Sequence, residues 1–307
     1  MNFAIRGIAV SLAVFVLAYG LLSCAVAFGW KLAARARRLR ANANFLFGLR
    51  MLPLTVAVFV AGVFVVPSFL FLEPRSVHEP IGAVPFGLSF CSIALLVAGW
   101  SRAAAGLRKT SRMVAEWMKG STTSGLKAAL PLVRVRGAAP ALAVVGIRHP
   151  RVLISDDAAA VLKEAELQAA LRHEVAHVRH RDNLKKLLFQ SCPFPGMARL
   201  EAAWREASET AADEAAVTSS NQAVDLAAAL IKLARLGAGP TADFSTALID
   251  SSRVAARVER LMAWDETRRR FSFAYVMVPI LATFGAGMMV YGTMLAHTHA
   301  LTEWLVR

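Results

Sequence analysis

Apolar residues gather in four long blocks without charges, and ordinary polar sequence separates them. The blocks cover residues 7–30, 51–72, 81–100 and 271–296. Each reaches the about 20 residues that an α-helix needs to cross the hydrocarbon core of a bilayer. Backbone groups in lipid must be hydrogen-bonded within their own segment, so we expect four membrane-spanning helices. Pro85 and three glycines make the third block the weakest of the four.

Lys and Arg residues near the ends of these blocks indicate the orientation of the chain. Six of them lie in the stretch 31–50 and further clusters border the segment 101–270, whereas only Arg75 lies between the second and third blocks. An excess of Lys and Arg marks cytoplasmic loops. We therefore expect the N-terminus outside the cytoplasmic (inner) membrane, a basic cytoplasmic loop at 31–50, a cytoplasmic domain at 101–270 and a short external tail at 297–307.

A cleaved signal peptide is the alternative for residues 1–28, because Leu21-Leu22-Ser23-Cys24 loosely resembles a lipid-attachment site. A signal peptide carries its positive charge before the apolar run. Here Arg6 stands alone before the run, and five basic residues follow it by residue 40. The charge asymmetry favours a retained membrane helix.

The middle of the chain has the pattern of a soluble region with strands and helices. The β-branched runs 141–147 and 151–155 predict a pair of strands, and Ser155-Asp156-Asp157 is typical of a helix start. Helices are expected at 164–190, 197–218, 223–236 and 253–264, with Pro193 and Pro195 after the first. The segment 102–119 has an apolar face; it either lies along the membrane surface or extends the third helix.

The expected helix 164–190 carries His173-Glu174-Val175-Ala176-His177. Residues four apart on a helix lie on one face, so both imidazoles can bind one ion. Glu174 is displaced by about 100° around the helix, where it can act as general base on a metal-bound water. This H-E-x-x-H pattern predicts a zinc site of metallopeptidase type.

A catalytic zinc site needs a third protein ligand and an open position for water. The next expected helix offers Glu209 and Asp213, again four apart. We expect Glu209 to be the third ligand and Asp213 to accept a hydrogen bond from a ligand histidine. Glu206 is a competing ligand without an Asp four residues later, and His180 lies too far along the helix from His173.

A di-iron site is a different interpretation, because Glu174 and His177 also form an E-x-x-H motif. Di-iron bundles need that motif twice, together with two further carboxylates. The sequence contains it once. The pattern therefore favours a single Zn²⁺ ion.

Together these motifs resemble a family of membrane metallopeptidases. The stretches that carry the resemblance are PRVLIS from Pro150, ELQAALRHEVAH from Glu166, Arg181-Asp182 and ETAADEAA from Glu209. They are similar to the antirepressor-receptor peptidases of β-lactam sensing and, more distantly, to the heat-shock and prenyl-protein membrane proteases. The resemblance covers about residues 141–262 and includes the later segments 227–234 and 253–261.

The resemblance implies a mostly α-helical polytopic membrane protein with a cytoplasmic, gluzincin-like α+β metallopeptidase domain. Three helices before that domain and one after it is the arrangement of the antirepressor receptors. Those receptors carry an extracellular sensor domain after the last helix, whereas only a short stretch follows residue 296 here. Direct sensing of β-lactams is therefore not expected, and a signal would enter through the helices, the outer loop or another protein.

The formal net charge of +14 adds little to this picture. Much of the excess flanks the apolar blocks, where anionic lipid headgroups attract it. Nucleic-acid binding would require a basic patch with a reading motif inside the soluble region, and the sequence shows neither. The lipid bilayer is thus the expected partner of the basic residues.

The expected function is zinc-dependent cleavage of a protein substrate at the cytoplasmic membrane face. The substrate would be a transcriptional repressor or a membrane protein, and the role signal transduction or membrane quality control. Two alternatives stay open at this stage. One is a switch that cleaves only itself or a single regulator, and the other is a binding scaffold with a degenerate metal site.

Overall fold

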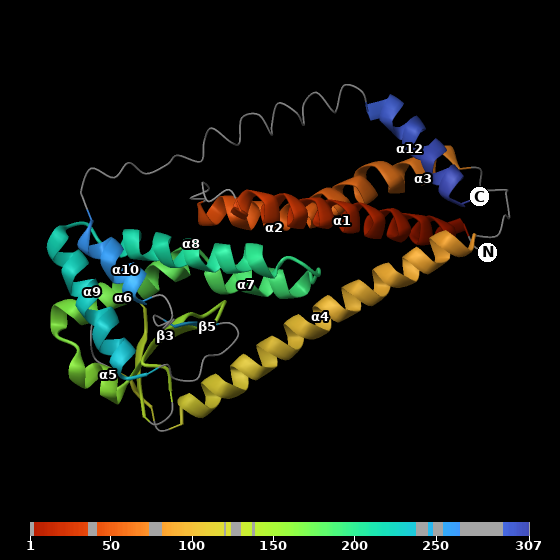
Figure 1. The fold of residues 1–307 in the computed structure, drawn as a ribbon. Coiled ribbons are helices and arrows are strands. Elements are labelled where there is room, and N and C mark those ends of the chain that lie inside the picture. Colours follow the sequence, from red (N-terminus) through yellow and green to blue (C-terminus); the bar gives the residue numbers. More distant parts are fainter. Residues whose placement is uncertain are drawn as a thin grey trace.

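A computed structural model describes residues 3–35, 42–73, 82–119, 121–123, 130–136, 139–237, 245–247, 254–264 and 291–306. The described chain is mostly helical, with one small sheet. Long apolar helices form an elongated bundle, and the sheet and the shorter helices form a domain at one end of it (Figure 1). Both chain termini lie at the opposite end of the bundle.

Among the described residues, three helical segments are long and apolar enough to cross a membrane. They are α1 (Phe3–Arg35), the continuous run of α2 (Ala43–Phe59), the π-helix η1 (Val60–Val65) and α3 (Val66–Leu72), and α4 (Ala83–Trp117). They coincide with the first three apolar blocks and confirm that each of these is helical and a candidate membrane span. Residues 265–290, which hold most of the fourth expected span, lie outside the described residues.

The helices extend beyond the apolar blocks that predicted them. Because α1 continues to Arg35 and α2 begins at Ala43, the expected loop at 31–50 is shorter than its charges indicated. Asn42 caps α2 by accepting a hydrogen bond from the backbone N–H of Asn44 at 2.9 Å. The amphipathic segment 102–119 continues α4, which settles the two alternatives for it in favour of helix extension.

The expected tail at 297–307 is also helical over most of its length. It belongs to α12 (Tyr291–Val306), which packs against α3 and η1. Thr302 on this helix is buried. The packing of α12 against α3 and η1 explains why this segment is an ordered helix of the bundle.

The sheet has five strands in the order β1-β2-β4-β3-β5. Their bounds are β1 Thr122–Thr123, β2 Leu132–Val135, β3 Leu142–Val145, β4 Arg151–Ser155 and β5 Ser245–Ala247. The pair β3 and β4 is antiparallel, as the sequence predicted, and Gly146 begins the turn with φ +94°. A Cβ there would meet the backbone oxygen of His149 at 2.8 Å, so the turn requires glycine.

In the described part of the chain, six helices complete the domain. They are α5 (Asp156–Val161), α6 (Glu164–Arg179), α7 (Asp182–Ser191), α8 (Ala198–Ala216), α9 (Ser220–Arg235) and α10 (Val254–Met262). Ser155 caps α5 by accepting from the N–H of Ala158 at 3.1 Å, which confirms the helix start expected there. Helices α8, α9 and α10 match the helices expected at 197–218, 223–236 and 253–264 closely. The helix expected at 164–190 does not match.

The prediction of a single helix at 164–190 is wrong, because the helix is interrupted between α6 and α7. Arg181 adopts a left-handed conformation with φ 56°, and α7 starts at Asp182. The uninterrupted helical composition of this stretch gave no sign of the break. The Asp182 side chain turns back toward His177, and this tertiary contact stabilises an otherwise unfavourable backbone conformation.

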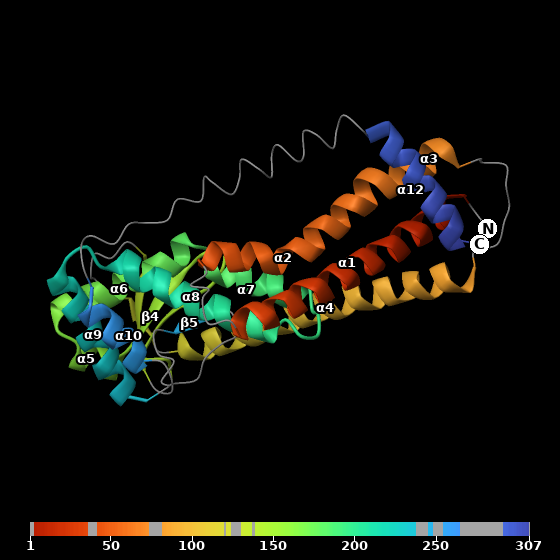
Figure 2. The same ribbon diagram turned by 45° about the horizontal axis from the view of Figure 1, so that its top comes forward.

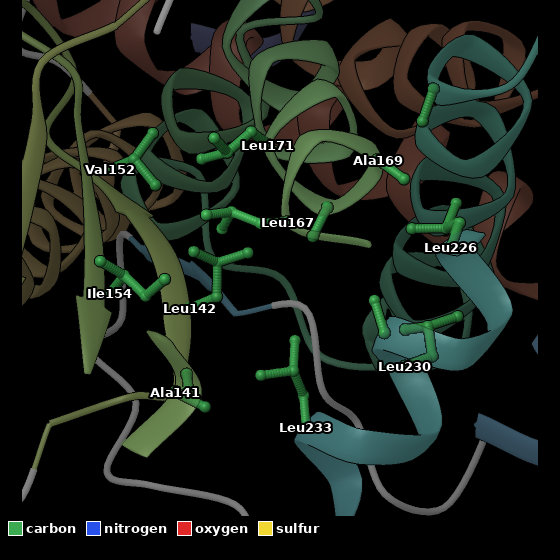
Figure 3. Close-up of a cluster of buried hydrophobic side chains, with 14 of the residues drawn as sticks. Ala141, Leu142, Val152, Ile154, Leu167, Ala169, Leu171, Leu226, Leu230 and Leu233 are labelled. Atoms are coloured by element: carbon green, nitrogen blue, oxygen red, sulfur yellow. The ribbon is translucent and has the colours of Figure 1, made fainter. Parts of the chain in front are cut away.

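The core of the domain lies between the sheet and the helices α6 and α9. Leu142, Val152 and Ile154 from the strands face Leu167 and Leu171 of α6, and the leucines of α9 close the cluster (Figure 3). Small alanines such as Ala169, which is fully buried, let α6 approach its neighbours closely. α6 is therefore held on two sides, which fixes the orientation of its remaining face.

The turn between α7 and α8 is embedded in the membrane bundle. Tyr19 in the middle of α1 donates a hydrogen bond to the carbonyl of Cys192 at 3.0 Å, and Arg50 of α2 donates to the same carbonyl at 2.7 Å. Arg50 also binds Glu201 of α8 at 2.8 Å. Helices α7 and α8 lie alongside the ends of α1, α2 and α4 (Figure 2), so the domain is built onto the bundle and not merely tethered to it.

Candidate active site

Helix α6 carries three of the predicted site residues into the interior of the domain. His173 and Glu174 are fully buried, and His177 is 2 % exposed. The two imidazoles lie one turn apart, and their Nε2 atoms approach to 3.1 Å. Two ring nitrogens so close together, on side chains four residues apart, can bind one ion between them.

Helix α8 brings Glu209 to the same point. Its Oε2 lies 3.5 Å from Nε2 of His173, and its Oε1 lies 3.6 Å from Nε2 of His177. One possible ligand atom from each of the three residues lies within 4.8 Å of the others. The side chain of Glu209 is 27 % exposed, which makes it the most exposed of the three.

Each histidine is backed by a carboxylate on its other ring nitrogen. Nδ1 of His173 lies 3.0 Å from Oδ1 of Asp213, and Nδ1 of His177 lies 2.7 Å from Oδ2 of Asp182. A carboxylate at Nδ1 favours the tautomer with its proton there and leaves the Nε2 lone pair for a metal. Ser208 donates a hydrogen bond to Asp182 at 2.5 Å and holds that carboxylate in place.

The structure thus brings together four of the residues that the sequence singled out, His173, His177, Glu209 and Asp213, and Glu174 is buried next to His173 on α6. We refer to His173, His177 and Glu209 as the metal-binding group; within the described residues, neither Glu206 nor His180 belongs to it.

Two participants were not predicted. Asp182 appeared only as part of a similar stretch, and Arg257 of α10 was not considered. Arg257 is buried and lies 3.0 Å from Glu209 Oε2 and 2.6 Å from Asp213 Oδ1. Asp182 lies five residues after His177 in the sequence, and this short separation was the one sign that the two side chains could meet. Their contact also needs the left-handed residue Arg181, which the sequence did not predict.

The cluster shifts the protonation of its members strongly. Burial alone would lower the pKa of His173, but Asp213 and Glu209 outweigh it and raise the pKa to about 9. Burial would raise the pKa of Glu209, yet His177, His173 and Arg257 lower it to about 2. The pKa of Asp213 is lowered in the same way by His173 and Arg257. The carboxylates are therefore ionised, and a proton or another cation is strongly favoured between them.

Glu174 lies between the metal-binding group and the sheet. Its Oε2 accepts a hydrogen bond from the backbone N–H of Val144 in β3 at 3.1 Å. The strand expected at 151–155 is β4, an inner strand with β2 on one side and β3 on the other. Neither of its edges is therefore available for an extended substrate.

The donor set fits a catalytic zinc ion. Two imidazole nitrogens and one carboxylate make up the three protein ligands of that class, with the fourth position left for water. Both Nε2 atoms face the carboxylate of Glu209. A second carboxylate contacts Nδ1 of each ring and fixes its orientation, as such a site requires.

Apolar helices long enough to cross a membrane and a His-His-Glu group that could hold a metal ion are the features expected of a membrane-associated metallopeptidase. Residues 127–261 match the family model described as BlaR1 peptidase M56, which confirms the similarity to the antirepressor-receptor peptidases over this region. The matched segment contains the whole metal-binding group and reaches to the end of α10. No curated protein matches the chain.

Proposed function

We propose that the protein is a zinc-dependent endopeptidase that cleaves a protein substrate at the cytoplasmic face of a membrane. The observation that supports this most is the pairing of each metal-facing histidine with its own buried carboxylate, with Glu174 beside them. A scaffold that does not bind metal has no need for such an arrangement. The match to a peptidase family supports the same conclusion.

In the proposed mechanism His173, His177 and Glu209 hold the ion. Zinc bound there would polarise the substrate carbonyl and lower the pKa of a water molecule to about 7. Glu174 takes the proton from the attacking water and later gives it to the leaving amine. Asp182 and Asp213 keep the histidines oriented and balance the positive charge that gathers in the site.

The side on which the domain lies follows from the basic residues of the sequence. Lys31 and Arg35 at the end of α1 and Arg50 in α2 mark the end of the bundle that meets the domain. An excess of such residues favours the cytoplasmic side. The candidate substrates are therefore a cytoplasmic regulator, such as a transcriptional repressor, or the cytoplasmic part of a membrane protein.

The proposal is tested with the purified full chain in detergent and a peptide library prepared from a proteome digest. Wild type loaded with zinc is expected to bind one ion per chain and to cleave a subset of the peptides. Glu174→Gln is expected to bind the same amount of zinc and to lose activity by about 10²- to 10⁴-fold. Equal cleavage by both proteins, or no zinc bound by wild type, would contradict the proposal.

A further inference from the structure

Helix α10 presents one charged residue to the interior of the domain. Its apolar residues Val254, Val258 and Leu261 pack onto the core shared with α9. Arg257 lies between them in sequence and is only 3 % exposed. A buried cation is costly unless it is paired and hydrogen-bonded, so its partners are informative.

The partners of Arg257 are the two carboxylates of α8 at the metal-binding group. Nε donates to Oδ2 of Asp213 at 3.0 Å and Nη2 donates to Oδ1 at 2.6 Å, which makes a two-pronged contact. Nη1 lies 3.0 Å from Oε2 of Glu209. The planar guanidinium thus fixes both carboxylates at once, which the point charge of a lysine could not do.

These contacts reach the histidine as well as the carboxylates. The contact with Asp213 holds the carboxylate at Nδ1 of His173, and Nη2 of Arg257 also lies 3.5 Å from Nε2 of the same ring. The contact with Glu209 uses Oε2, so Oε1, the oxygen nearer to His177, remains for an ion. A carboxylate held by one oxygen is favoured as a ligand through the other.

We propose that Arg257 is a positioning residue of the zinc site, which holds Glu209 as a ligand through one oxygen and holds Asp213 against His173. This inference rests on the proposed zinc peptidase and adds a residue that contacts no reacting atom. It also makes α10 part of the site, since displacement of that helix would release both carboxylates together.

The test measures zinc affinity of the full chain in detergent by competition with a chelating dye, together with the visible spectrum of the cobalt-loaded protein. Arg257→Gln is expected to bind zinc about 10- to 100-fold more weakly than wild type. Arg257→Lys keeps a buried cation and is expected to lose less, which provides a folded variant if the glutamine variant fails to fold. Cobalt spectra of both variants should differ from that of wild type.

Arg260→Gln is the matched control, because Arg260 lies one turn later on α10 and contacts Thr210 of α8, which is not a member of the metal-binding group. The zinc affinity of Arg260→Gln should stay within about twofold of wild type, since the contact of Arg260 is with Thr210 and not with a carboxylate of the site. A purely structural role of Arg257 would instead lower the melting temperature of the variants and leave zinc affinity and cobalt spectrum unchanged.

A double-variant cycle with Asp213→Asn gives the second readout. If Arg257 acts through Asp213 and Glu209, the double variant should lose less affinity than the product of the two single losses. Wild-type affinity in both Arg257 variants, or losses that multiply, would overturn the inference while the zinc site stands. A wild type that binds no zinc would overturn the proposed function itself, and this inference with it.

Discussion

At the scale of single residues, the site depends on carboxylates that contact the histidines from behind. Asp182 is 1 % exposed and lies 2.7 Å from Nδ1 of His177. Removing its charge would leave the tautomer of His177 undetermined. The structure therefore assigns to Asp182 the same task for His177 that Asp213 has for His173.

Asp182→Asn is expected to weaken zinc binding by about 10- to 100-fold, because an amide can present its N–H₂ to Nδ1 and favour the wrong tautomer. Chelator competition measures the change. Asp157→Asn is the control, since Asp157 lies exposed at the start of α5. Equal affinities of wild type and Asp182→Asn would show that the contact does not orient the ring.

Glu166 supplies a test that depends on pH. It is buried at the start of α6, accepts a hydrogen bond from the N–H of Lys163 at 2.8 Å and pairs with Lys232 of α9 at 2.6 Å. Burial would raise its pKa, but Lys232 and the backbone contact at Lys163 outweigh this and lower it. The stabilisation is thus present above the unfolded-state pKa and is lost as pH falls through the lower folded-state value.

Glu166→Gln should accordingly lower stability by about 1 kcal/mol at neutral pH. Melting temperatures of wild type and variant, recorded in detergent from pH 7 downward, should converge in acid. A difference that persists below the folded-state pKa of Glu166 would show that the charge of Glu166 does not contribute.

The sequence predicted the metal-facing residues because they follow helix periodicity. His173, Glu174 and His177 sit on one stretch of helix, and Glu209 and Asp213 share a face of the next. Arg257 lies 44 residues from Asp213 in the sequence and has no motif around it, so only the fold reveals the contact. Long-range pairs of this kind leave no periodic trace.

At the scale of elements, the turn between α7 and α8 joins the membrane bundle to the site. α7 begins at Asp182, which contacts His177, and α8 carries Glu209. The turn between them is bound by Tyr19 and Arg50. A shift of the membrane helices would therefore be transmitted to both sides of the metal-binding group.

Gly99 of α4 shows how closely the bundle approaches α7. A Cβ at this position would meet the backbone oxygen of Ser191 at 2.1 Å. Gly99→Ala is therefore expected to push α7 away and to lower stability by about 1–3 kcal/mol. Thermal unfolding in detergent measures the loss.

Gly87→Ala on the same helix is the matched control, because a Cβ there meets nothing within 4 Å. It should be neutral or stabilising by up to about 1 kcal/mol, as alanine is the better helix former. Equal melting temperatures for the Gly99 and Gly87 variants would contradict the close packing of α4 on α7.

Secondary structure was predictable where hydrophobic pattern and capping residues agree, as in α5, α8 and α9. The strands β2 and β5 were missed, because each is only a few residues long and acquires its partners from distant segments. The break at Arg181 was missed because the composition of the stretch is helical throughout, and the contacts of Asp182 with His177 and Ser208 appear only in the folded structure.

At the scale of the whole molecule, the domain lies at one end of the bundle of apolar helices and α12 lies at the other (Figure 1). On the proposed function, the excess of Lys and Arg at the domain end predicts that this end faces the cytoplasm and that the two termini lie across the membrane from it.

Cysteine labelling tests this orientation in a background where Cys24, Cys91 and Cys192 are replaced by alanine. Arg148→Cys lies exposed in the turn between β3 and β4, and Ala300→Cys lies exposed on α12. A membrane-impermeant thiol reagent added to intact cells should label only Ala300→Cys. Labelling of Arg148→Cys alone would reverse the orientation.

The central claim is that this domain cleaves peptide bonds with Glu174 as its base. The most direct measurement compares new protein N-termini in cells that express wild type or Glu174→Gln at equal levels. The account predicts a set of termini present only with wild type, a single substrate indicating a switch and many indicating quality control. Identical termini in both cultures, with zinc bound to both proteins, would contradict it.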